Sequence, residues 1–187
     1  MKNFLLFIVV LLLGIGIQAA EYKDVTLPDE VTVDGVKKVL NGMAMREVFK
    51  FGFYVKIYVG GLYLKEKSSD ADAILASPET KQIIIEHTRS IGASDMLEGW
   101  AGTKKGCVEK CEEWDAAYKE FAKYIGAVKK GTRYTFTFYP DRLKMETPAK
   151  TGEIKSASFS KNMLHIFIKS DQIVSEAFRK EMLGIKK

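Results

Sequence analysis

Two long runs of strand-forming residues, 36–49 and 51–64, follow each other directly and constrain the fold more than any other part of the chain. Two kinds of side chain alternate along the second run, with Phe53, Val55, Ile57 and Val59 set between Tyr54, Lys56 and Tyr58. A period of two is typical of a β-strand. We therefore predict a long hairpin that turns near residues 50–52. Within it, Gly60 and Gly61 predict a bulge or the close approach of another backbone segment.

The rest of the chain contains runs of strands and runs of helices rather than a regular alternation of the two. Further strands are predicted at 22–27, 31–34, 81–88, 132–139, 142–147 and 152–158. Helices are predicted after Ser69 as N-cap, from Ser94, along an apolar stripe from Cys107 to Ile125, and at 160–169 and 171–183. This order predicts an α+β fold in which helices cover one face of a large antiparallel sheet.

The first twenty residues have the pattern of a secretory signal peptide. Lys2 supplies a positive start, residues 4–13 form an unbroken apolar run, and small residues at Ala19-Ala20 offer a cleavage site. The apolar run is shorter than the ~20 residues that a membrane-spanning helix needs. We expect an exported protein, periplasmic or secreted, with no stable membrane insertion after cleavage. Residues 1–20 would be removed and 21–187 would form one domain; a retained anchor is the alternative.

Composition excludes several classes of function. The formal net charge is +5 and charges of both signs alternate along the chain, so we expect no nucleic-acid partner. The sequence has neither a zinc-type spacing nor a phosphate-binding glycine loop, so we expect no metal and no cofactor.

Cys107 and Cys111 lie four residues apart, which on a straight helix is too far for a disulfide. We therefore expect two unbonded core thiols, with a strained or regulatory bond as the alternative. The oligomeric state stays open.

Arg46 is the strongest candidate for a functional residue. Its flanking residues are apolar, namely Met43, Ala44, Met45 and Val48. A guanidinium in such surroundings is costly without a partner, so Arg46 needs an anion. That anion is either a carboxylate of the protein, such as Glu47, or a ligand. His87 and His165 lie in different predicted elements, and for both we expect a hydrogen-bonded structural role rather than that of a general base.

The stretch 40–64 also resembles the chalcone isomerase family, in particular its bacterial chalcone-isomerase-like branch. The resemblance rests on Asn41-Gly42-x-x-x-Arg46 followed by Gly61-Leu62-Tyr63-Leu64, and on the order of elements over most of 22–184. It implies an open-faced β-sandwich. It also implies a role for Arg46, because the matching arginine holds an anionic substrate oxygen in the isomerases and a carboxylate in the related plastid fatty-acid-binding proteins. The planar fork of donors on arginine suits both tasks.

Two departures from the isomerase pattern argue against cyclising activity. Tyr58 stands where the isomerases have a threonine that polarises the substrate ketone, and its hydroxyl reaches several ångströms further out. The helix expected at 94–107 matches the isomerase helix that supplies a tyrosine and an asparagine, yet it contains neither. Trp100 is the nearest large aromatic residue there, and it either packs in the core or lines the ligand site.

These observations favour non-catalytic binding of a fatty acid or another small apolar anion in a cleft between sheet and helices. Arg46, Tyr58 and Trp100 are the expected ligand-binding residues, and no catalytic residue is expected. The first alternative is an intramolecular lyase of the chalcone isomerase type, in which Arg46 stabilises the oxyanion. The second is a structural or partner-binding envelope protein, in which Arg46 is only an ion pair.

Overall fold

The structure is a computed structural model that describes residues 19–50 and 52–185. Its strands are β1 (Ala19–Tyr22), β2 (Val25–Pro28), β3 (Glu30–Val33), β4 (Val36–Lys50), β5 (Phe53–Leu64), β6 (Lys81–His87), β7 (Arg133–Phe138), β8 (Leu143–Glu146) and β9 (Thr151–Ile154). Its helices are α1 (Ala71–Ala76), α2 (Ala93–Ala101), α3 (Trp114–Ala122), α4 (Ala157–Ile168) and α5 (Glu176–Met182), with 3₁₀ turns at Gly102–Gly106 and Cys111–Glu113.

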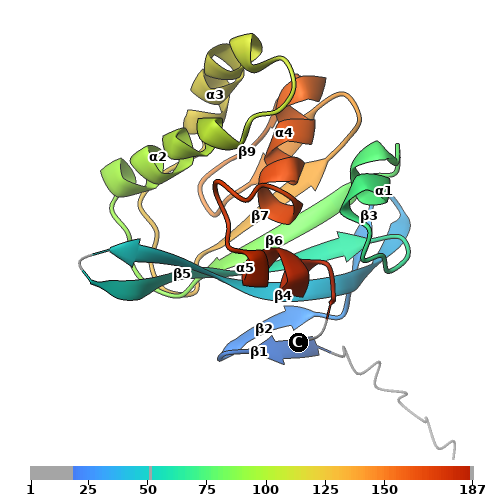
Figure 1. The fold of residues 1–187 in the computed structure, drawn as a ribbon, viewed down its shortest axis with the longest axis horizontal. Coiled ribbons are helices and arrows are strands. Elements are labelled where there is room, and N and C mark those ends of the chain that lie inside the picture. Colours follow the sequence, from blue (N-terminus) through green and yellow to red (C-terminus); the bar gives the residue numbers. More distant parts are fainter. Residues whose placement is uncertain (1–18, 51, 186–187) are drawn as a thin grey trace, which may run out of the picture.

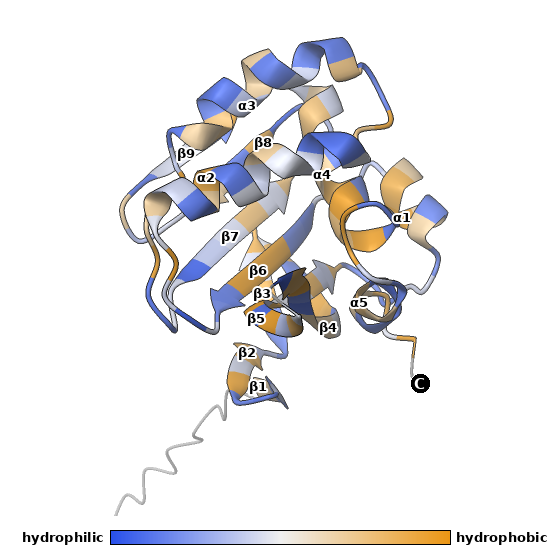
Figure 2. Ribbon diagram, turned by 60° about the vertical axis from the view of Figure 1, so that its left-hand side comes forward, coloured by the Kyte–Doolittle hydropathy of each residue, from blue (hydrophilic) through white to orange (hydrophobic). Residues whose placement is uncertain are grey.

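Strands β3 to β9 form one seven-stranded antiparallel sheet in which each strand pairs with its neighbour in sequence. All five helices lie on one face of this sheet, and the separate β1–β2 hairpin lies against the other face (Figure 1). Apolar residues line β6 and the side of α4 that meets the sheet (Figure 2). The prediction of an α+β, open-faced β-sandwich with helices over one face is confirmed. Antiparallel neighbours can be joined by short turns and need no crossover helix. This explains why the sequence lacks a regular alternation of strands and helices.

A β-bulge interrupts the alternation that was predicted for the second long strand. Arg46 pairs with Tyr58 and Glu47 pairs with Lys56, which leaves Ile57 as an extra residue on β5. Ile57 and Tyr58 therefore pack into the same hydrophobic cluster beneath the helices. The prediction that these two residues face opposite sides of the sheet is wrong, because a bulge places two consecutive residues opposite one partner residue.

Gly60 and Gly61 do not form the predicted bulge, but Gly61 does mark a close approach. A Cβ atom at Gly61 would lie 2.7 Å from Leu27 Cδ1. Leu27 belongs to β2, and it forms a second, smaller core cluster with Val59 and Met45 on the far face of the sheet. The absence of a side chain at position 61 thus allows the β1–β2 hairpin to pack closely against the sheet.

A second bulge explains the Asn-Gly pair at the start of the arginine motif. Asn41 is the extra residue on β4, and its side-chain amide donates to the backbone oxygen of Met182 at the end of α5 (3.1 Å). A Cβ atom at Gly42 would lie 2.1 Å from the backbone oxygen of Glu181. Gly184 follows with a φ of 68°, the left-handed conformation expected of a residue that ends a helix. The pair therefore locks the C-terminal end of α5 onto β4.

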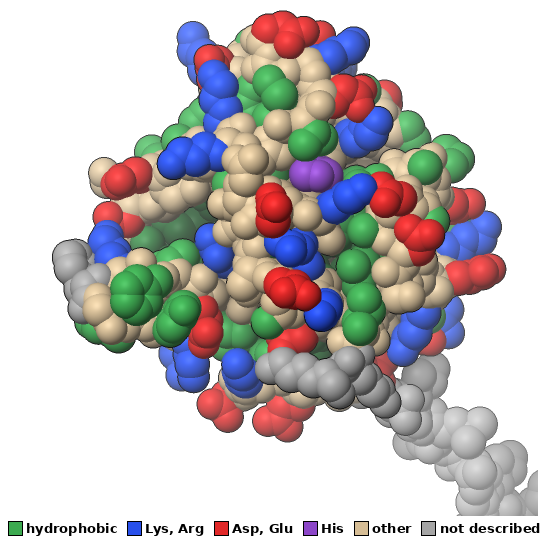
Figure 3. Space-filling model, viewed as in Figure 1, with side chains coloured by type: hydrophobic (Ala, Val, Ile, Leu, Met, Phe, Trp, Pro, Cys, Tyr) green, Lys and Arg blue, Asp and Glu red, His purple; other side chains and the backbone are tan. Residues whose placement is uncertain are grey.

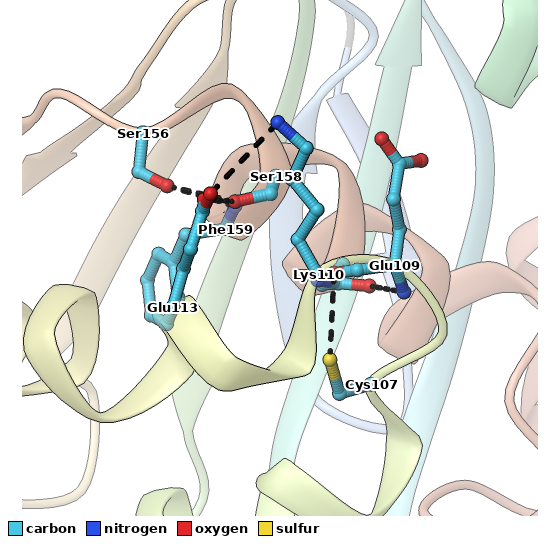
Figure 4. A network of polar contacts seen from close by, with 8 residues as sticks. Cys107, Glu109, Lys110, Glu113, Ser156, Ser158 and Phe159 are labelled. Carbon is cyan, nitrogen blue, oxygen red and sulfur yellow. Dashed lines mark hydrogen bonds and ion pairs between the residues drawn. The ribbon is translucent and has the colours of Figure 1, made fainter.

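The segment from Cys107 to Glu113 corrects two predictions. Cys107 and Cys111 form a disulfide with a Cα–Cα separation of 5.8 Å, so the prediction of two free thiols is wrong. The continuous helix expected from Cys107 is also wrong, because Cys107 is extended and Lys110 is left-handed (φ 49°). Without helical geometry the four-residue spacing no longer separates the two sulfur atoms. Figure 4 shows how the segment is held: Lys110 lies 3.8 Å from Glu113, which accepts a hydrogen bond from Ser158 of α4 (2.7 Å).

Two smaller points concern helix and chain ends. Asp70 rather than Ser69 caps α1, and its carboxylate accepts hydrogen bonds from the amides of Asp72 and Ala73. Most of the predicted signal peptide lies outside the described residues, which begin at Ala19 in β1. In the described part of the chain, no helix has the length and apolar character needed to span a bilayer.

Candidate functional site

Arg46 and Tyr58 lie directly opposite each other on the long paired strands β4 and β5. Directly opposed residues of an antiparallel pair point to the same face of the sheet. Tyr58 is buried in the main hydrophobic cluster, so this is the face covered by the helices. The sequence motif and the register together therefore place a cation and a phenol side by side between the sheet and the helical layer.

Three aromatic rings surround Tyr58. The ring centroids of Phe178 on α5, His87 on β6 and Phe167 on α4 lie 6.2, 6.3 and 6.5 Å from that of Tyr58. Burial raises the pKa of Tyr58 to about 12, and the positive charge of Arg46 opposes this rise. The phenol is therefore protonated at neutral pH and is able to donate a hydrogen bond. Within the described part of the chain its hydroxyl makes no hydrogen bond, and the hydroxyl oxygen is not itself fully enclosed, although the ring is buried.

The Arg46 guanidinium is half-buried and uses little of its hydrogen-bonding capacity. Its Nη1 donates to the backbone oxygen of Glu47 at 2.9 Å. Among residues 19–50 and 52–185, no carboxylate lies within 4.0 Å of it. Because arginine carries five N–H donors in a planar fork, most of them are left to meet solvent or a ligand. The structural ion pair with Glu47 that the sequence left open is not present in this structure.

His87 closes the same site from β6 in the position directly opposite Tyr58. Its Nδ1 lies 2.9 Å from the backbone oxygen of Thr132, and burial lowers its pKa. A neutral imidazole that donates from Nδ1 to a carbonyl is a structural histidine. His165 on α4 similarly contacts the backbone oxygen of Gly106 at 3.2 Å. Both hydrogen bonds agree with the structural role expected for the two histidines.

Thr88 is a polar residue next to the site that the sequence did not single out. Its Oγ1 is buried and has no hydrogen-bond partner. Among the described residues it is the one buried side-chain nitrogen or oxygen atom that lacks a partner. Thr88 also lines an open cavity of about 590 Å³ together with Val55 and Lys56. Its backbone amide bonds to Ile57, so this cavity begins immediately beside the Tyr58–His87 pair. An orphaned hydroxyl at a cavity wall is consistent with a site that receives a polar ligand atom.

Trp100 occupies a different part of the same core. Its ring centroid lies 5.4 Å from that of Phe121, 5.5 Å from Phe136 and 6.2 Å from Phe167. Phe167 therefore stands between Trp100 and Tyr58. The indole supports the aromatic layer behind the site, while Arg46 and Tyr58 form the polar pair itself. A second cavity, of about 350 Å³, lies under α1, and Arg46 and Tyr58 line neither this cavity nor the one at Thr88.

The curled seven-stranded antiparallel sheet with helices on one face matches the chalcone isomerase-like fold. The chain belongs to the chalcone isomerase-like family, whose sequence profile matches residues 19–184. A search of curated protein sequences found no match. Among solved structures, a fatty-acid binding protein of Arabidopsis thaliana is similar with a TM-score of 0.70 and 13% sequence identity. The alignment covers 89% of this chain and 96% of the plant protein. At this identity the likeness shows the shared fold.

Proposed function

We propose that this protein binds a small apolar anion, such as a fatty acid, without catalysing a reaction on it. The observation that carries the proposal is the Arg46 guanidinium, which faces the helical layer beside Tyr58 and, among the described residues, has only the backbone oxygen of Glu47 as a partner. A carboxylate that accepts two N–H groups from Arg46 and the hydroxyl of Tyr58 would satisfy both side chains. The aromatic rings around Tyr58 would contact the first part of the alkyl chain.

The apolar character of the ligand follows from the surroundings of the pair. Phe167, Phe178 and the ring of Tyr58 present carbon atoms rather than hydrogen-bonding groups. The open cavity at Thr88 lies next to the pair along β5, since it is lined by Val55 and Lys56, and it would be the side from which the ligand reaches solvent. The name of the Arabidopsis protein agrees with this ligand class, although the proposal for this chain rests on the chemistry of its own residues.

An intramolecular lyase is the less favoured function because the donors that polarise the substrate ketone are missing. Tyr58 replaces the threonine, and α2 supplies Trp100 to the core instead of a tyrosine or an asparagine to the site. Loss of one positioned donor costs about 2.7–4 kcal/mol of transition-state stabilisation. We therefore expect no loss of chalcone absorbance above the spontaneous rate. Turnover that disappears in Arg46→Ala would establish the lyase instead.

The proposal includes export, with removal of residues near the N-terminus. Its support is the charged start, the short apolar run and the small residues at Ala19-Ala20. Cleavage after Ala20 would leave Glu21 to pair with Thr26 and Tyr22 to pair with Val25. N-terminal sequencing of protein from the envelope fraction is expected to start at or near Glu21. A full-length form in the cytoplasm would contradict export.

Mass spectrometry of lipid extracted from the purified protein tests the binding proposal directly. We expect fatty acid in an amount comparable to that of the protein, and much less in Arg46→Ala purified in the same way. Protein that carries no lipid and takes up none when fatty acid is added would refute the proposal. Equal lipid in both proteins would show that a ligand binds but that Arg46 is not its anchor.

A further inference from the structure

The β4–β5 hairpin extends beyond the rest of the sheet. Strand β6 pairs with β5 only from Tyr58 to Tyr63. The outer residues of the hairpin, 47–50 and 53–56, pair only with each other, and we call them the arm. In Figure 1 the arm projects at the left of the molecule, past the ends of the neighbouring strands.

The arm carries aromatic side chains that the protein leaves in contact with solvent. Phe49, Phe53 and Tyr54 are exposed by 66%, 58% and 70% of their surface. Phe49 and Tyr54 stack edge to face across the two strands, with centroids 5.2 Å apart. Figure 3 shows hydrophobic side chains gathered at the outer end of the arm, with a hollow between the arm and the helical layer. Large aromatic residues gathered on an exposed edge mark an interaction surface.

The charges around the aromatic residues are mainly positive. Lys56 on the arm and Arg89 just after β6 are exposed and line the same cavity as Phe53 and Tyr54. In the described part of the chain neither of these two cations has a carboxylate within 4.0 Å. Glu47, at the base of the arm, lies opposite Lys56 in the strand register. The surface therefore combines aromatic rings with unpaired basic groups.

We propose that the arm inserts its aromatic residues into the surface of a lipid bilayer that contains anionic lipids. Phenylalanine and tyrosine side chains settle at the boundary between headgroups and acyl chains. Lysine and arginine beside them attract anionic headgroups while their stems cover apolar surface. The arm presents both kinds of residue on one projecting ribbon.

Two properties of the arm favour a bilayer over a second copy of the chain. Three aromatic side chains of about 150–250 Å² each, roughly two-thirds exposed, present on the order of 300–500 Å². A stable protein interface needs about 800 Å² from each partner. Contact between two arms would also bring Lys56 and Arg89 of each copy together, with Glu47 as the one acidic residue among the described residues of the arm.

The base of the arm is also the site that holds Arg46 and Tyr58, so insertion of the tip would place that site next to the bilayer surface. This arrangement suits exchange of an apolar anion with a membrane. The insertion itself does not depend on the proposed ligand, because the aromatic and basic residues of the arm are not those that would hold the carboxylate.

A tryptophan reporter tests the insertion. The full chain with Tyr54→Trp is mixed with vesicles of phosphatidylcholine and phosphatidylglycerol whose acyl chains carry bromine, which quenches tryptophan on contact. The two native tryptophans, Trp100 and Trp114, are only 8% and 3% exposed and contribute a constant background. Val108→Trp is the matched control, since Val108 is 61% exposed and lies outside the arm. Both proteins share the N-terminal apolar run, so attachment through that run acts on both alike.

We expect strong quenching of Tyr54→Trp and little quenching of Val108→Trp. Equal quenching of both reporters, or none in Tyr54→Trp, would overturn the proposal. A change in sedimentation that depends on protein concentration and is lost in Phe53→Asp would show self-association through the arm and would also overturn it.

The charge requirement gives a second, independent measurement. Lys56→Gln with Arg89→Gln is expected to weaken partitioning onto the anionic vesicles by roughly 30-fold. The charge-matched control replaces Lys67 and Lys155, two exposed lysines at the opposite end of the sheet. An equal loss in the control would mean that the net charge of the whole protein, and not the arm, governs binding. Melting curves of every variant identify any that fail to fold.

Discussion

Replacing Arg46 with alanine separates a ligand anchor from a structural residue. If the guanidinium holds a carboxylate, its removal deletes charged hydrogen bonds worth about 1.5–3 kcal/mol of binding free energy. That loss corresponds to roughly 10–150-fold in the dissociation constant. Arg46→Lys is expected to recover only part of the affinity, because a single ammonium cannot reproduce the planar fork of donors.

The ligand-free protein should tolerate the same change. The hydrogen bond that Arg46 makes within the described protein goes to the backbone oxygen of its neighbour Glu47 and is only partly buried, so its loss falls at the lower end of the range for a charged group, about 1.5 kcal/mol. Arg133→Ala is the matched control. Arg133 lies on the same sheet, but it pairs with Glu86 at 2.7 Å and donates to the backbone of Thr26 in the opposite layer. We expect this variant to lose stability and to keep its affinity.

Calorimetric titration with a fatty acid, beside melting curves of the ligand-free proteins, measures both quantities. The informative result is the opposite behaviour of Arg46→Ala and Arg133→Ala in the two assays. A large drop in the melting temperature of Arg46→Ala, with its affinity unchanged, would refute the reasoning and make Arg46 a structural residue.

Three further predictions concern the fold. The native protein should resist alkylation without reductant, and replacing Cys107 and Cys111 with serine should lower the free energy of unfolding by about 2 kcal/mol; alkylation of both thiols in the folded protein, seen by intact mass, would contradict this. Gly42→Ala should cost about 3 kcal/mol, because its Cβ would lie 2.1 Å from a backbone oxygen. Gly99→Ala, on the open side of α2, should stabilise by about 0.5–1 kcal/mol; similar denaturant midpoints for the two variants would refute the close-approach argument. Burial lowers the pKa of His87, so the unfolded chain binds the proton first and stability should fall as the pH drops below about 6.5. His87→Gln should reduce this fall in melting temperature, and an unchanged pH profile would show that His87 is not its source.

Local patterns in the sequence were sufficient for the long hairpin, the antiparallel sheet and the position of the arginine. Strand periodicity and turn residues depend on neighbours along the chain. Tyr58 was singled out by the family resemblance, and its place directly opposite Arg46 depends on the bulge at Ile57. The N-cap of α1 was predicted to within a residue, at Ser69 instead of Asp70, whereas α4 begins at Ala157 rather than at residue 160 and α5 begins at Glu176 rather than at residue 171.

Features that depend on distant segments came only from the tertiary structure. The bulge at Ile57 arises from pairing between two strands, and the Asn41–Gly42 pair is explained only by the end of α5, about 140 residues further along the chain. The disulfide between Cys107 and Cys111 formed because the backbone there leaves the helical conformation that the apolar spacing predicted. Periodicity reports which side chains are buried, but the path of the backbone that buries them is decided by packing against elements far away in sequence.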